Sequence, residues 1–151
     1  EKTAWTKPLA GFERGRKSAA AINAPVLSEA GRSHNMQMYW GGAVIALKAD
    51  VALQLKTAGQ MTLSDVLAKL KPCCLGKGRA WRAGEFFDQL DHLSDSKIFS
   101  ELYQQQVTER AYPEYKQLLT DLGVVYRNNQ KVKINTQAPL AHIRKRIGSG
   151  R

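Results

Sequence analysis

The sequence is poor in the residues that most often build a metal or redox centre. It has three histidines, His34, His92 and His142, and two cysteines, the neighbours Cys73 and Cys74. A zinc peptidase carries H-E-x-x-H, in which two histidines lie one helical turn apart, and no pair here has that spacing. The cysteines lack the spaced partners of a zinc site, and adjacent cysteines rarely bridge. We therefore expect a thiol pair, with no metal ligand and no cofactor site in this chain. Asp91 and His92 could act as a general base and the residue that orients it, but a solvated surface pair is the favoured interpretation.

Long apolar runs are also lacking. The best candidate, residues 43–55, is interrupted by Lys48, Asp50 and Gln54, so no membrane span is predicted. At 151 residues, with 43% hydrophobic and 24% charged residues, the chain has the composition of one globular domain.

Acidic residues are scarce relative to basic ones. The chain has 13 Asp and Glu against 23 Lys and Arg, a formal charge of +10, which raises the question of an anionic partner. The cations are distributed along the sequence, and no helix-turn-helix, RNA-recognition or zinc-finger pattern accompanies them. A solvated basic surface is the favoured interpretation, and nucleic acid is not the expected partner. The denser basic groups are Arg14, Arg16, Lys17, Arg144, Lys145 and Arg146.

Helix breakers crowd the first 35 residues. Prolines and glycines recur there, so residues 1–35 are predicted to form an irregular arm. Trp5, Leu9 and Phe12 would anchor this arm to the rest of the protein. The breakers are Pro8, Gly11, Gly15, Pro25 and Gly31.

Helical periodicity dominates the remainder. Apolar residues at spacings of three and four predict a long helix over about 36–57, followed by helices from Thr62 to Pro72, over 83–93, from about 95 to 107, and from Pro113 to Gly123. Thr62 and Asp65 are expected to form a shortened capping box, and Ser94 or Asp95 is expected to cap the helix that follows. Alternation in 124–126 and 131–134 predicts a β-hairpin, and a last short helix is expected over 140–147. The predicted fold is mainly α: a bundle of about five to six helices (36–123) with an irregular arm (1–35) and a hairpin plus basic C-terminal helix (124–151) packed on the same domain.

A family resemblance emerges from residues 36–123. The segment from Met38 to Leu47, with Tyr39 three residues before Gly42, resembles a helix opening in gluzincin-type zinc aminopeptidases. Residues 57–66 are similar to the element T-x-G-x-x-[ST]-L-x-D-V of the glycyl aminopeptidase branch. The pair Phe86-Phe87, the helix beginning near Phe99 and the stop at residues 122–123 follow in the order of that family.

The resemblance implies a helical C-terminal region that packs against a catalytic zinc domain of the same polypeptide. The zinc ligands and catalytic glutamate would lie upstream of Glu1, so zinc and a peptide substrate are expected of the parent protein, and this fragment alone should not be catalytic. One role transfers: Tyr39 would stabilise the oxyanion of the tetrahedral intermediate. The alternative for Tyr39 is an aromatic residue that only packs. The alternative for the chain is a non-enzymatic basic helical module that binds nucleic acid or an acidic protein.

Overall fold

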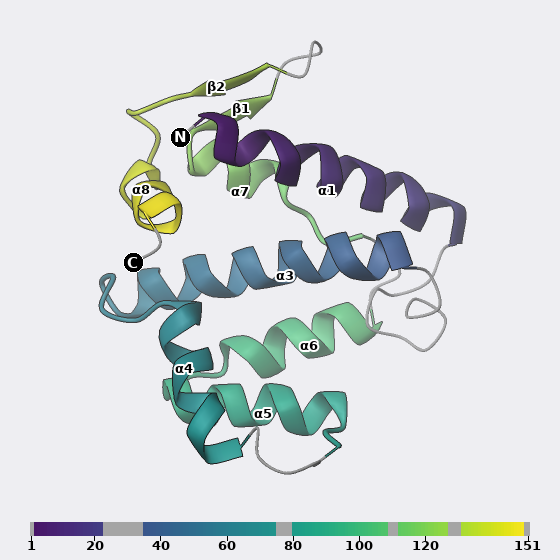
Figure 1. Ribbon diagram of the computed structural model, residues 1–151, viewed down its shortest axis with the longest axis vertical. Coiled ribbons are helices and arrows are strands. Elements are labelled where there is room, and N and C mark those ends of the chain that lie inside the picture. The colour runs from purple at the N-terminus through teal and green to yellow at the C-terminus, as the bar shows by residue number, and fades with distance from the viewer. Residues whose placement is uncertain (1, 23–34, 75–79, 109–111, 127–130, 150–151) are drawn as a thin grey trace.

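The computed structural model describes residues 2–22, 35–74, 80–108, 112–126 and 131–149. These residues form a mainly helical fold with one small hairpin (Figure 1), which confirms the predicted fold class. Among the described helices, none is both long and apolar enough to cross a bilayer. In chain order the elements are α1 (Lys2–Ile22), α3 (Asn35–Lys56), α4 (Leu63–Cys74), α5 (Ala83–Ser94), α6 (Ile98–Thr108), α7 (Lys116–Asp121), β1 (Val124–Tyr126), β2 (Val132–Ile134) and α8 (Ala141–Ser149).

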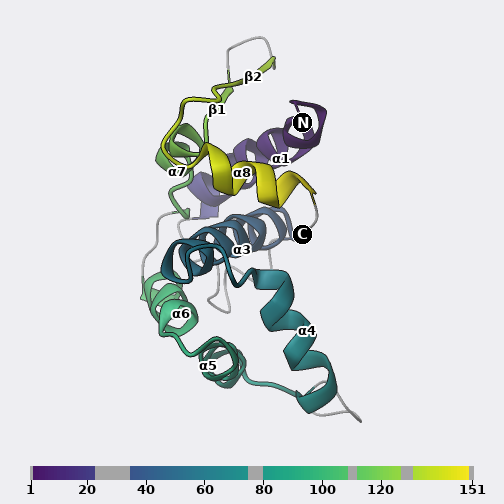
Figure 2. The ribbon, with the colours of Figure 1, turned by 90° about the vertical axis from the view of Figure 1, so that its left-hand side faces the viewer.

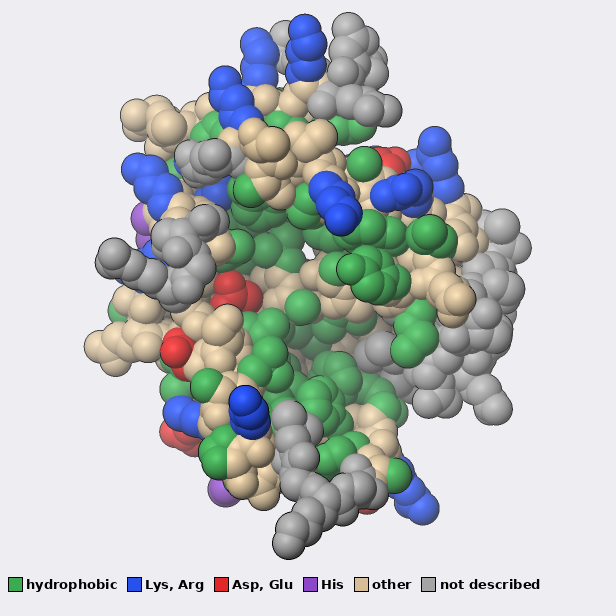
Figure 3. Space-filling model, viewed as in Figure 1, with side chains coloured by type: hydrophobic (Ala, Val, Ile, Leu, Met, Phe, Trp, Pro, Cys, Tyr) green, Lys and Arg blue, Asp and Glu red, His purple; other side chains and the backbone are tan. Residues whose placement is uncertain are grey.

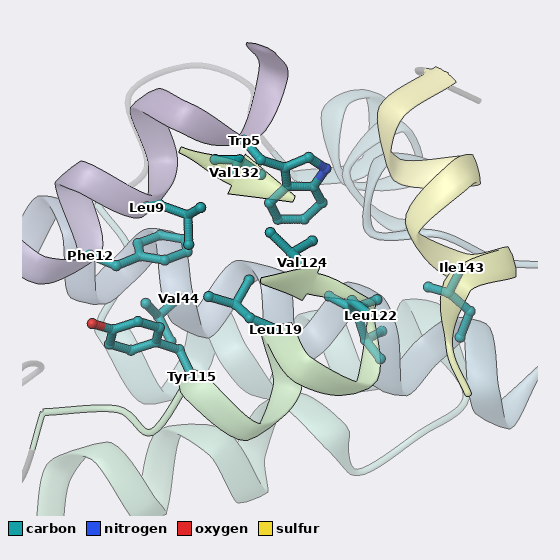
Figure 4. Packing of buried hydrophobic residues seen from close by; sticks show 11 residues of the cluster. Trp5, Leu9, Phe12, Val44, Tyr115, Leu119, Leu122, Val124, Val132 and Ile143 are labelled. Carbon is teal, nitrogen blue, oxygen red and sulfur yellow. The ribbon is translucent and has the colours of Figure 1, made fainter. Parts of the chain in front are cut away.

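Helix α3 runs through the middle of the molecule and separates two layers. On one side lie α1, α7, the hairpin and α8, and on the other lie α4, α5 and α6 (Figures 1 and 2). Each layer has its own core. The upper core consists of Trp5, Leu9, Phe12, Val44, Val51, Tyr115, Leu119, Leu122, Val124, Val132 and Ile143 (Figure 4). The lower core consists of Ala49, Leu53, Val66, Leu70, Leu90 and Phe99.

The apolar residues of α3 surround the helix axis, because the helix serves both cores. Val44 and Val51 are buried in the upper core, while Ala49 and Leu53 are buried in the lower one. A helix that is apolar on every side requires cover on every side. The sequence of α3 therefore demands the two layers that the structure provides.

The prediction of an irregular N-terminal arm is wrong for residues 2–22, which form α1; residues 23–34 lie outside the described part. Trp5, Leu9 and Phe12 are four and three residues apart, a helical spacing, and all three are buried in the upper core, as the anchoring hypothesis required. Pro8 lies within this helix. Burial of the apolar face against α3 outweighs the weak local helix propensity, as tertiary packing commonly does.

The two glycines of α1 are contact residues. A Cβ atom on Gly11 would lie 2.3 Å from the indole ring of Trp40, and one on Gly15 would lie 2.8 Å from the Cβ atom of Trp40. Only the absence of side chains lets the backbone of α1 approach α3 so closely. The residues that suggested a broken helix are those that allow this helix to dock.

The second layer begins at a capping box that the sequence predicts correctly. The Thr62 amide donates to Asp65 Oδ2 at 2.8 Å, and the Asp65 amide donates to Thr62 Oγ1 at 3.3 Å. The predicted stop at Pro72 is too early, because α4 continues to Cys74.

The C-terminal elements complete the upper layer. In the antiparallel hairpin, Val124 pairs with Ile134 and Tyr126 with Val132, as the alternating pattern predicts. Arg144 is fully buried rather than part of a surface basic group, and its Nη1 atom donates to Leu122 O at 2.6 Å and to Asn135 O at 2.9 Å. The guanidinium thus joins α8 to the end of α7 and to the hairpin.

Substitution by alanine should change the free energy of unfolding in opposite directions at two helical glycines, Gly11 and Gly42. Gly11→Ala places a methyl group against Trp40, and we expect it to lower the free energy of unfolding by about 1 kcal/mol or more. Gly42→Ala is the matched control, because a Cβ atom there would meet nothing within 4 Å. Alanine should stabilise that position by about 1 kcal/mol through helix propensity. Urea unfolding of both variants measures the difference, and equal shifts of the same sign would contradict the packing described above.

Candidate functional site

Tyr39 lies in the second turn of α3 with 69% of its surface exposed. Its ring meets the edge of Trp40, with centroids 5.0 Å apart and planes at 85°. Within the described residues, nothing hydrogen-bonds its hydroxyl group. Trp40 in turn meets Phe12 edge-on at 6.2 Å and has the guanidinium of Arg14 5.7 Å from its ring centroid. Tyr39 is therefore held on a rigid base while its phenol points to solvent.

The same face of α3 continues from Tyr39 as a row of small residues. Positions 39, 43, 46 and 50 are separated by four, three and four residues, so they lie on one side of the helix. Ala43 and Ala46 are only half-buried. Neither layer fully covers this side of α3.

Two apolar hollows flank this row. The lower hollow, of about 230 Å³, lies between α3, α4 and α5, and the upper one, of about 310 Å³, lies between α1, α3 and α8. A third hollow between them shares Ala46 and Leu63 with the lower one and Leu47 and Ile147 with the upper one. Figure 3 shows hydrophobic side chains lining this hollowed middle of the molecule. We call the α3 row from Tyr39 to Asp50 with its flanking hollows the α3 surface.

Asp50 closes the far end of the α3 surface and is already engaged. Its Oδ1 atom accepts the Leu63 amide at 2.7 Å, and its Oδ2 atom accepts Gln54 Nε2 at 3.0 Å. The carboxylate therefore fixes the start of α4 against α3. Its role is structural.

The histidines and cysteines are not brought together. His92 and His142 are exposed on α5 and α8, and His34 lies outside the described residues. In the described part of the chain, no group of three or more His, Cys, Asp or Glu side chains could hold a metal ion. Cys73 and Cys74 form a disulfide at the end of α4, which corrects the expected thiol pair.

Asp91 and His92, which could have formed a general base and the residue that orients it, lie in different environments: Asp91 is buried and His92 is exposed. Asp91 is 3% exposed and accepts the amides of Phe99 and Ser100 at 2.8 and 3.1 Å. It therefore caps the N-terminus of α6 from the preceding helix, in the place expected for Ser94 or Asp95. A carboxylate at this position also complements the helix dipole.

A polar cluster that the sequence did not reveal joins α1 to α7. Glu13 accepts a hydrogen bond from the Tyr115 hydroxyl. Its Oε2 atom also forms an ion pair with Arg16 Nη2 at 2.9 Å. Burial raises the pKa of Glu13, but the hydrogen bonds from Arg16 and Tyr115 outweigh it and leave this pKa below its ordinary value. Burial and the bond to Glu13 raise the pKa of Tyr115. Only the spacing of Glu13 and Arg16 was visible in the sequence; Tyr115 is about a hundred residues away.

This cluster should make stability depend on pH. A carboxyl whose pKa is lowered by folding stabilises the folded state above its ordinary pKa of 4.5, and this contribution is lost as the pH falls through the folded value. Glu13→Gln should therefore lower the melting temperature at pH 7, and its difference from the unchanged chain should shrink as the pH falls from 7 to 3. Asp88→Asn, an exposed position on α5, is the control and should show little difference at either pH. A Glu13→Gln deficit that persists undiminished at pH 3 would refute the electrostatic explanation.

Comparison of the chain with known protein families, with curated proteins and with solved structures found no match.

Proposed function

We propose that this chain is the helical C-terminal domain of a zinc aminopeptidase-like protein of the gluzincin type. It would pack against an upstream catalytic zinc domain of the same polypeptide and form one wall of the substrate cleft. The observation that carries the proposal is the α3 surface, on which an exposed tyrosine adjoins an uncovered apolar face. The chain alone would be inactive, because the zinc ligands would belong to the other domain.

The exposure of Tyr39 favours a chemical role over a packing role. A residue that contributed mainly by packing would be buried, whereas Tyr39 is 69% exposed and its ring touches the edge of Trp40. A phenol on a rigid helix, free to donate a hydrogen bond, is suited to meet negative charge as it develops on a scissile carbonyl oxygen.

The apolar face beside Tyr39 supports a neighbouring domain as the partner. Contiguous apolar hollows on a protein surface mark interaction sites. Here Trp40, whose ring contacts that of Tyr39, lines the upper hollow, so a domain seated there would bring its own groups close to Tyr39. Leu67, 42% exposed, lines the lower hollow and would gain cover in the same contact.

The catalytic part of the proposal predicts a specific kinetic change in the parent protein. Tyr39→Phe should lower kcat about a hundredfold and leave KM nearly unchanged, because the hydrogen bond forms only in the transition state. Thermal stability should be unchanged, since the ring remains. Tyr126→Phe on β1, also exposed, is the matched control and should retain full activity. A Tyr39→Phe enzyme with unaltered kcat would remove Tyr39 from the mechanism.

The docking part can be tested separately by placing a charge on the α3 surface. Ala46→Arg should abolish binding of the chain to the separately produced upstream part of the polypeptide, because a guanidinium cannot be buried there without a partner. Ala68→Arg, an exposed position on α4, adds the same charge away from this surface and should leave binding intact. Calorimetric titration of the two variants measures the effect. Equal binding by both would show that the α3 surface is not the docking face.

A further inference from the structure

The positive charge of the protein is concentrated in one of its two layers. In the upper layer, residues 2–22, 112–126 and 131–149 contain eleven Lys and Arg against three Asp and Glu. In α3 and the lower layer, residues 35–74 and 80–108 contain six Lys and Arg against seven Asp and Glu. The described residues therefore divide into a layer of formal charge +8 and a remainder of −1. The basic residues are spread along the sequence but are concentrated in one layer of the fold. Figure 3 shows the blue Lys and Arg side chains mostly in the upper half of the molecule.

Part of this charge forms a row along α1. Lys7, Arg14 and Lys17 are exposed. Arg14 follows Lys7 by seven residues, close to two helical turns, and Lys17 follows Arg14 by three, so the three residues lie along one side of the helix. At a rise of 1.5 Å per residue, the row extends over about 15 Å. We call these three residues the α1 row.

The α1 row is not neutralised by nearby acids. Within the described residues, the ion pair on α1 joins Glu13 to its neighbour Arg16, not to the row. Neither Lys7 nor Lys17 has a described acidic partner within 4.0 Å. Arg14 lies over Trp40, a contact that leaves its charge in place.

The surroundings of the row distinguish between classes of anionic partner. The large apolar residues that are exposed in the described chain lie on α3, α4 and β1, and none lies on α1. The large apolar residues described on α1 line the upper core and the upper hollow, and none of them is in the α1 row. An interface with an acidic protein or insertion into a bilayer would engage apolar side chains at its centre. Contacts with nucleic acid are more polar and far more positive.

We infer that the α1 row is a sequence-independent contact for the phosphate backbone of a nucleic acid. Its length matches about four to five successive phosphates of one strand, at 3.4 Å of axial rise per phosphate. The row supplies positive charge but no side chain placed to hydrogen-bond with base edges, so it would hold a strand without distinguishing its base sequence. This role is independent of the proposed peptidase function, because it uses neither Tyr39 nor the α3 surface.

The salt dependence of binding tests the inference on the 151-residue chain. The probe is a fluorescein-labelled duplex DNA of about 20 base pairs, followed by anisotropy from about 50 to 200 mM salt. Lys7→Gln with Lys17→Gln should make the slope of log affinity against log salt shallower by about 2, because each lost phosphate contact releases about one counterion fewer. A duplex of unrelated sequence should give the same affinity.

The matched control is Lys71→Gln with Lys97→Gln, which removes the same charge from exposed positions in the lower layer. Its slope should equal that of the unchanged chain, and both double variants should melt at the same temperature as that chain. Equal slope changes in the two double variants would show that net charge alone drives binding. Absence of binding at about 50 mM salt, a strong sequence preference, or equally tight binding to polyglutamate would also overturn the inference.

Discussion

The close contact between α1 and α3 is the constraint on which the upper half of the protein depends. The side chain of Trp40 occupies the space that side chains at Gly11 and Gly15 would need, with its ring at Gly11 and its Cβ atom at Gly15, so the backbone of α1 packs directly against Trp40. This approach brings Trp5, Leu9 and Phe12 into the core that α7, the hairpin and α8 complete. Without it, those short C-terminal elements would have little apolar surface to pack against, since a two-stranded hairpin is marginal by itself.

Helix α3 transmits this constraint to the other half. One of its sides closes the upper core and another closes the lower core, so the two layers share a single rigid element. The side between them, from Tyr39 to Asp50, is left with small residues and flanking hollows. The proposed function concerns this third side. A helix that is apolar all round is expected to be covered all round, and an additional domain would supply the missing cover.

The two proposed surfaces differ in their physical chemistry. The α3 surface is apolar and concave, and the α1 row is polar, cationic and convex. A buried apolar contact gains from excluding water, whereas contact with phosphates gains from releasing counterions. The two can therefore be disrupted independently, by a charge in the first case and by its removal in the second. Trp40 lies between the two surfaces, because its ring contacts Tyr39 and has the guanidinium of Arg14 over it.

The sequence by itself determined most of the local structure. Apolar spacing indicated α3, α5, α6 and α8, the Thr62-Asp65 pattern indicated the capping box, and Gly123, with φ of +76°, indicated the end of α7. These features depend on residues within a few positions of one another, so a linear pattern can express them. The solvent-facing position of Tyr39, by contrast, is a property that the resemblance to a peptidase helix could not supply.

Only the tertiary structure decided how distant residues are used. From the sequence, Gly11 and Gly15 are predicted to break a helix. Their actual role is to allow contact with Trp40, which is about 25–29 residues away in the sequence. Arg144 read as surface charge until two backbone carbonyls enclosed it. Asp91 read as half of a solvated pair until α6 folded back onto it. The charge of the chain read as evenly spread, because segregation into layers depends on which helices pack together. In each case the deciding partner is remote, and a local pattern carries no information about it.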